Sequence, residues 1–123
     1  MTLDELADAT ELRADQVREL EQYGILAGRA VGGTTYYDEE CLVAANLAAG
    51  FLRFGVEPRH LRMYKTAAER EAGFFEQLVL PLLKQRNPRA RKQAMDTLVE
   101  LSRLGQGLRA AMLRAALRDS TSG

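Results

Sequence analysis

The stretch Val17-Arg18-Glu19-Leu20-Glu21-Gln22-Tyr23-Gly24-Ile25-Leu26 contains the end of a helix and decides how the N-terminal half folds. Val17 and Leu20 are three residues apart, which places them on one face of a helix. Gly24 follows where helices commonly end in the left-handed conformation, and the next two residues are apolar, as such an end requires. The pattern therefore predicts a helix from about Arg13 to Tyr23 whose apolar face packs on a core.

Upstream of this stretch, Thr2-Leu3-Asp4-Glu5 has the Thr-x-x-Glu spacing of a capping box. We expect a short helix to begin there and to end at a tight connection near Ala9-Thr10-Glu11. Two short helices joined by a few residues form the outline of a helix-turn-helix.

Downstream, Ala27–Tyr37 combines three glycines with short β-prone runs, which predicts a small hairpin, or wing. Asp38 is placed to cap the next helix, which should run to Phe54 and end at Gly55. Its inner face is expected to contribute to the same core.

The remaining chain is predicted to be helical, with two interruptions. Pro58 suits the first turn of a helix that reaches Ala72, and Gly73 is expected to break it. An apolar stripe follows over residues 74–83, and Pro81 within it should kink or divide that helix. Asn87-Pro88 then begins a last helix that runs to about Arg118.

Apolar and small residues in this last helix are spaced 4-3-4-3-4-3, as in a coiled-coil seam. The seam consists of Ala94, Leu98, Leu101, Gly105, Leu108, Met112 and Ala115. We predict that it joins two copies of the chain in a homodimer, chiefly through Leu98, Leu101, Leu108 and Met112. The alternative is that the seam packs within one chain.

The chain is neutral in total, with 17 Lys and Arg against 17 Asp and Glu, but the charges are sorted by position. Residues 1–56 hold ten acids and four bases, a net charge of −6, and residues 57–123 carry the opposite charge of +6. The densest basic patch consists of Lys84, Arg86, Arg89, Arg91 and Lys92. It is suited to a phosphate backbone, an acidic partner or the acidic half of a second subunit, or it is simply a solvated helix face.

The order of these segments resembles the MerR-type winged helix-turn-helix regulators over roughly Thr2–Glu71. The quoted stretch is similar to that family's Leu-Arg-Tyr-Tyr-Glu-x-x-Gly-Leu-Leu signature. Residues 34–42 are similar to its Tyr-Arg-Arg-Tyr-Ser-x-x-Asp-Leu segment, and residues 52–62 to its turn into the next helix. The resemblance also extends to the C-terminal domain of some actinobacterial MerR-like regulators, which carry a separate winged helix-turn-helix upstream.

The resemblance implies a DNA-facing surface, and its candidate contacts are Arg13, Gln16, Arg18, Arg29, Tyr36 and Tyr37. Arg18 matches a family arginine, but the two aromatic residues expected after it are Glu19 and Leu20 here. Thr35 and Tyr36 stand where the family has an arginine pair. Duplex DNA is a dense line of negative charge, so these departures predict weakened DNA binding.

The sequence offers no pattern for catalysis, a metal or a cofactor. Cys41 is the single cysteine and His60 the single histidine, and no nucleophile elbow or phosphate loop is present. No apolar run approaches the roughly 18 residues that a membrane span needs. An acidic N-terminus without an apolar signal core predicts a cytoplasmic protein.

Together these patterns predict a mainly α winged helix-turn-helix with a small β-hairpin wing and a C-terminal helical extension. The expected boundaries are 1–72 for the winged helix-turn-helix, 73–118 for a dimerisation and regulatory extension, and 119–123 for a disordered tail. The interpretation is a MerR-type regulator domain that supplies dimerisation and regulatory contacts, with weak or auxiliary DNA binding. Two alternatives stay open: a sequence-specific DNA reader, and a module that binds a small-molecule or protein effector without DNA.

Overall fold

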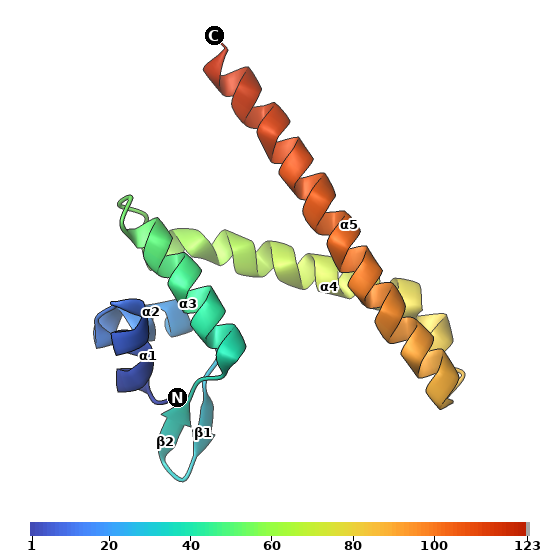
Figure 1. The fold of residues 1–123 in the computed structure, drawn as a ribbon, viewed down its shortest axis with the longest axis horizontal. Helices are drawn as coiled ribbons and strands as arrows, with labels where there is room; N and C mark the ends of the chain where they lie inside the picture. Colours follow the sequence, from blue (N-terminus) through green and yellow to red (C-terminus); the bar gives the residue numbers. More distant parts are fainter. Residues whose placement is uncertain (123) are drawn as a thin grey trace. The chain divides into compact units, whose positions relative to one another are not determined.

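A computed structural model describes residues 1–122, which fold mainly as helices with one two-stranded antiparallel hairpin (Figure 1). The order of elements is α1 (Leu3–Thr10), α2 (Ala14–Gln22), β1 (Arg29–Val31), β2 (Thr34–Tyr36), α3 (Glu39–Leu52), a 3₁₀ helix (Pro58–Leu61), α4 (Arg62–Leu83) and α5 (Pro88–Thr121). The chain divides into two compact units, Met1–Glu69 and Arg70–Gly123. The predicted fold class, a mainly helical winged-helix-like fold with a small hairpin, is confirmed.

The capping box predicted for α1 is present. The Thr2 hydroxyl accepts a hydrogen bond from the Glu5 backbone N–H at 3.3 Å, and the Thr2 N–H donates to Oε1 of Glu5 at 2.9 Å. These bonds satisfy two backbone donors that a helix start leaves without partners. They also lower the pKa of the Glu5 carboxyl, chiefly through the bond from the Thr2 backbone.

The end of α2 also follows the prediction. Gly24 has φ of +80°, and the Ile25 N–H donates to the Leu20 carbonyl at 2.9 Å. A side chain at Gly24 would be strained by this backbone conformation. A Cβ at this position would also lie 2.4 Å from the Lys65 side chain. Glycine is therefore favoured here both by the backbone conformation and by the close approach of Lys65.

The wing is a tight hairpin in which Ala30 pairs with Thr35. Gly32 and Gly33 form its turn, and both have positive φ, as two-residue hairpin turns of this type require. Thr2 forms an antiparallel bridge to Tyr36, so the start of the chain lies beside β2, on the side opposite β1.

One apolar core holds the first unit together. Its buried members are Leu6, Ala7, Leu12, Val17, Leu20, Leu26, Tyr37, Cys41, Ala45, Ala48, Ala49 and Leu61.

α3 is fixed at its start by Asp38, whose carboxylate accepts from the Cys41 N–H at 2.9 Å. That bond is the main cause of the lowered pKa of Asp38. The predicted cap is therefore confirmed.

The predicted break of α4 at Gly73 is wrong, and of the two outcomes predicted for Pro81, division of the helix does not occur. The helix runs without a break through Gly73, and it continues past Pro81 to Leu83. Proline removes one backbone donor and crowds the preceding turn, but Pro81 lies so near the end of α4 that it does not divide the helix. A lone glycine costs helix stability without ending the helix.

α5 begins as predicted and extends further than predicted. Oδ1 of Asn87 accepts from the Ala90 N–H at 2.8 Å, which caps the helix start. The helix continues past Arg118 to Thr121, into the segment for which the sequence predicted a disordered tail. Gly123 lies outside the described residues.

The second unit buries fewer side chains than the first. Phe75 and Val79 of α4 and Ala90 and Ala94 of α5 are buried. These residues lie on either side of the connection between the two helices, so the apolar packing of this unit is concentrated near that connection. Beyond Ala94, the described part of α5 has no buried residue.

Candidate functional site

A hollow of about 570 Å³ lies between α1, α2 and the wing, where the family resemblance predicts a DNA-facing surface. Its charged groups are Arg18 from α2 and two carboxylates, Asp4 and Glu21. A phosphate placed here would meet more negative than positive charge. The hollow itself is therefore poorly suited to a polyanion.

Glu21 is engaged in fixing the wing. Its Oε1 accepts a 2.6 Å hydrogen bond from the Tyr37 hydroxyl, and its Oε2 accepts from the Gly28 backbone N–H at 3.3 Å. Burial, followed by this bond to the carboxylate, raises the pKa of Tyr37 to about 12. Tyr37 is only 4% exposed, so its hydroxyl is used within the protein.

The backbone on both sides of this tyrosine is tied to the start of the chain. The Tyr37 N–H donates to the Met1 carbonyl at 2.7 Å, and the Met1 ammonium group donates to the Tyr37 carbonyl at 2.8 Å. Tyr37 is therefore held through its side chain and its backbone at once.

The other predicted DNA contacts lie on the surface of the first unit. Arg13 precedes α2 and forms an ion pair with Asp15, with Nε and Oδ1 3.0 Å apart. Gln16 is half-buried and accepts from the Arg13 N–H at 2.9 Å. Arg18, Arg29 and Tyr36 are exposed.

Net charge differs between the two units. Residues 1–69 hold twelve acids and seven bases, a net charge of −5, and residues 70–123 hold ten bases and five acids, a net charge of +5. The unit with the winged-helix features therefore carries the charge that DNA repels.

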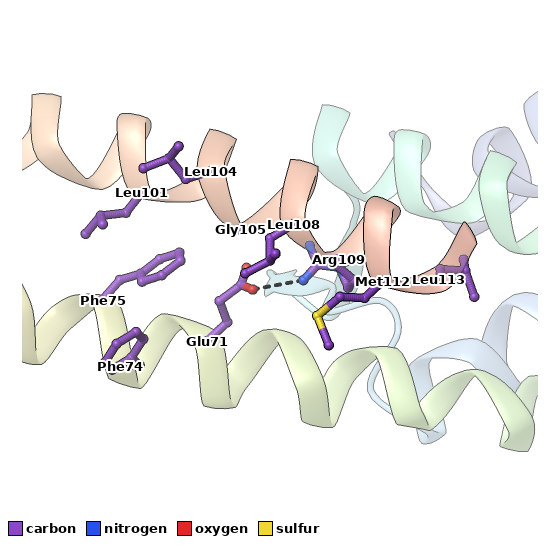
Figure 2. Close-up of a pocket in the computed structure, with 10 residues that line it drawn as sticks. All are labelled: Glu71, Phe74, Phe75, Leu101, Leu104, Gly105, Leu108, Arg109, Met112 and Leu113. Carbon is purple, nitrogen blue, oxygen red and sulfur yellow. Dashed lines mark hydrogen bonds and ion pairs between the residues drawn. The ribbon is translucent and has the colours of Figure 1, made fainter. Parts of the chain in front are cut away.

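A second candidate surface is an apolar groove of about 670 Å³ in the second unit, between α4 and α5. Phe74 and Phe75 of α4 line it, and Figure 2 shows Phe75 reaching toward Leu101 of α5, with Leu108 beside Glu71. One ion pair crosses it, between Nη1 of Arg109 and Oε2 of Glu71 at 2.9 Å. The groove is thus apolar along its length, with a single polar crossing.

The predicted seam residues differ in burial along α5. Leu98 and Leu101 are half-buried, whereas Leu108 and Met112 are both 64% exposed. Gly105 lies between Leu101 and Leu108 in the seam, and a Cβ at this position would lie 3.1 Å from Oε2 of Glu71. The first part of the seam is therefore packed more fully against α4 in the same chain, whereas Leu108 and Met112 line the groove but remain largely exposed.

The predicted basic patch lies at the connection between α4 and α5, and all five of its residues are exposed. Lys92 forms an ion pair with Asp96 at 3.0 Å. Among the residues that the structure describes, Lys84, Arg86, Arg89 and Arg91 form no ion pair.

Two side-chain contacts of the candidate surfaces were not predicted from the sequence. Glu21 accepts a hydrogen bond from Tyr37, which is sixteen residues away. Arg109 and Glu71 are thirty-eight residues apart. No local spacing signals either contact, because each depends on how distant segments pack.

The remaining polar candidates are structural. The Cys41 thiol is buried and lies 3.4 Å from the Ala27 carbonyl. Nδ1 of His60 accepts from the Glu57 N–H at 3.0 Å and so caps the 3₁₀ helix.

Within residues 1–122, no group of three or more His, Cys, Asp or Glu side chains is arranged to hold a metal ion. No helix in that range is long and apolar enough to cross a membrane.

The helical pair, the hairpin and the following helices define a winged-helix-like domain. Residues 1–121 match the family described as "Rv1828-like, C-terminal domain", and the chain belongs to that family. It is 29% identical over 119 residues to a protein of Mycobacterium tuberculosis and, equally, to one of Mycobacterium bovis. Both are named uncharacterized HTH-type transcriptional regulators. The match covers 97% of this chain but only 47% of each relative, so the chain spans about half of their length.

Proposed function

We propose that this chain is the dimerisation and regulatory domain of a MerR-type transcription regulator, with weak or auxiliary DNA binding of its own. The relatives named as HTH-type regulators support the class, and the sequence resemblance described above supports the MerR type. On this proposal the domain works in the cytoplasm and is not an enzyme. It needs no cofactor, and binding of a small-molecule or protein effector belongs to the alternative in which the domain does not contact DNA.

The observation that carries the proposal is the open second half of the seam. Leu108 and Met112 continue the register of Leu101 along the groove between α4 and α5, but each side chain remains 64% exposed in the single chain. α5 has 34 residues and is about 50 Å long at 1.5 Å per residue. A helix of this length with an exposed apolar seam is stabilised when a second copy covers it.

The weak DNA binding is supported by the charges of the winged-helix surface. Arg18 is exposed, but Asp4 and Glu21 share its hollow, and the first unit has a net charge of −5. A reading helix relies on bases that neutralise phosphates, and here the carboxylates oppose them. Sequence-specific reading is therefore assigned to another part of the regulator.

Two measurements on the same preparation test the proposal. Light scattering should give the mass of a dimer, and a labelled duplex should bind weakly and with little dependence on sequence. Tight, sequence-dependent binding that is abolished by Arg18→Ala would instead identify this domain as the reader. A monomeric mass at all concentrations would remove the dimerisation role.

A further inference from the structure

The five residues Lys84, Arg86, Arg89, Arg91 and Lys92, here called the basic turn, account for the net charge of the second unit. Residues 77–95 contain these five bases and no acid. The other five bases of the unit are matched by its five acids. The charge of +5 is thus concentrated at the connection between α4 and α5.

The backbone brings the members of the basic turn together. Lys84 and Arg86 lie in the connection after α4, and Arg86 has a positive φ of 52°, so the chain reverses there. The other three members lie in the first turns of α5, which begins at Pro88. All five side chains are exposed, and only Lys92 has an ion-pair partner in the part of the chain that the structure describes.

Bases at the start of α5 are electrostatically unfavourable for that helix. The N-terminal end of a helix carries partial positive charge and is stabilised by acids. α1 and α3 follow that rule, with Asp4 and Glu5 or Glu39 and Glu40 in their first turns. The first turn of α5 has no acid, and the bases that follow repel the helix end. A basic cluster that lowers helix stability, and of which only Lys92 has an ion-pair partner among the described residues, is explained by an anionic partner that supplies the missing charge.

We propose that the basic turn binds the phosphate backbone of duplex DNA without reading its sequence. The inference rests on the proposed function, because a transcription regulator works on duplex DNA. Guanidinium groups bind phosphate oxygens in bidentate geometry, and three of the five residues are arginines. Duplex DNA also offers a continuous row of phosphates, which suits several exposed cations better than a single acidic side chain does. The weak DNA contact of this domain is therefore made by residues of the second unit rather than by α2 and the wing.

The test compares two double variants of the full chain that remove the same charge. Arg89→Gln with Arg91→Gln removes two members of the basic turn. Arg114→Gln with Arg118→Gln removes two exposed bases from the same helix outside it. Each protein is titrated with two labelled duplexes of unrelated sequence over a range of salt concentrations, and its mass is measured by light scattering. Far-UV circular dichroism checks that α5 is intact.

We expect both duplexes to bind wild type equally, with an affinity that falls steeply as salt rises. The basic-turn variant should bind at least tenfold more weakly, and its salt slope should fall by about two, because each phosphate that a base neutralises contributes about 0.9 to the slope. The control variant should stay within threefold of wild type. Lys84→Gln, on the other side of the connection, should weaken binding in the same direction.

Equal losses in the two double variants would mean that only total charge matters, and would overturn the proposal. So would the absence of duplex binding by wild type at low salt. A basic-turn variant that changes the mass of the protein without changing DNA affinity would assign the cluster to an acidic protein partner instead. If the wild-type protein is monomeric and the basic-turn variant still binds duplex DNA more weakly, the dimerisation role would be excluded and this inference would hold.

Discussion

The Tyr37 hydroxyl donates a 2.6 Å hydrogen bond to Oε1 of Glu21, which joins the end of the wing to α2. The same carboxylate accepts from the Gly28 N–H at the other side of the hairpin. Glu21 therefore holds both ends of the wing from one side chain. Its position on α2 is compatible with a rigid wing but unfavourable for phosphate binding, which agrees with the weak DNA binding that we propose for this domain.

Tyr37→Phe should destabilise the first unit by about 1–2 kcal/mol, because it leaves a partly buried carboxylate without its strongest donor. Urea unfolding followed by circular dichroism measures the change. Tyr36→Phe is the matched control, since Tyr36 is exposed and should alter the free energy of unfolding by no more than a few tenths of a kcal/mol. Equal stability of the two variants would show that the bond contributes nothing.

The raised pKa of Tyr37, to about 12, predicts a loss of stability in alkali. The folded state retains the Tyr37 proton above the ordinary pKa of 10.0, at which the unfolded chain releases it. The stabilisation is therefore fully present below about pH 10 and is lost as pH rises toward 12. In an ultraviolet titration, the chain's four tyrosines should include one late-ionising component that Tyr37→Phe removes. Its persistence in that variant would assign the late component to another tyrosine.

Short-range features of the fold were predictable because a few neighbouring residues determine them. The Thr2–Glu5 box, the Gly24 helix end, the Asp38 cap and the Asn87 cap all depend on contacts within four or five positions. The break predicted at Gly73 and the division allowed for at Pro81 do not occur, because the helix-breaking tendency of one residue does not decide whether a long helix continues.

The candidate surfaces were less predictable than the helices. The spacing of the seam identified the apolar face of α5, but it did not indicate that Leu108 and Met112 stay largely exposed beside α4. Likewise, the sequence marked Tyr37 as a surface contact, whereas its burial depends on α2 and Met1 lying beside the wing. Such outcomes depend on packing between segments that are far apart in the chain.

The two glycines of α5 should respond differently to alanine. Gly107→Ala should stabilise the protein by about 1 kcal/mol, because alanine is the better helix former and, apart from the adjoining backbone of α5, no atom lies within 4 Å of the new Cβ. At Gly105 the new Cβ would lie 3.1 Å from Oε2 of Glu71 and 3.3 Å from Cζ of Phe75. The tight contact should offset most of the gain. Thermal unfolding of the two variants measures the difference, and an equal gain at both sites would contradict the close approach of α4 at Gly105.

Leu108→Glu tests the open half of the seam. Leu108 is 64% exposed in the single chain, so the substitution should leave the fold of each chain intact. In a dimer joined along the seam, it would bury two unpaired carboxylates, and a buried unpaired charge is strongly destabilising. We therefore expect light scattering to show monomers, with helix content unchanged.

The matched control for this variant is Val99→Glu, which places the same charge on α5 one residue away from the seam position Leu98. Val99 is 70% exposed, and its variant should remain dimeric because it lies off the seam. If both variants stay dimeric, another surface joins the two copies. If both become monomeric, added negative charge on α5 is sufficient to prevent association, and the seam loses its special role. The dimer contact is assigned to Leu108 and its neighbours in the seam only if Leu108→Glu is monomeric and Val99→Glu stays dimeric.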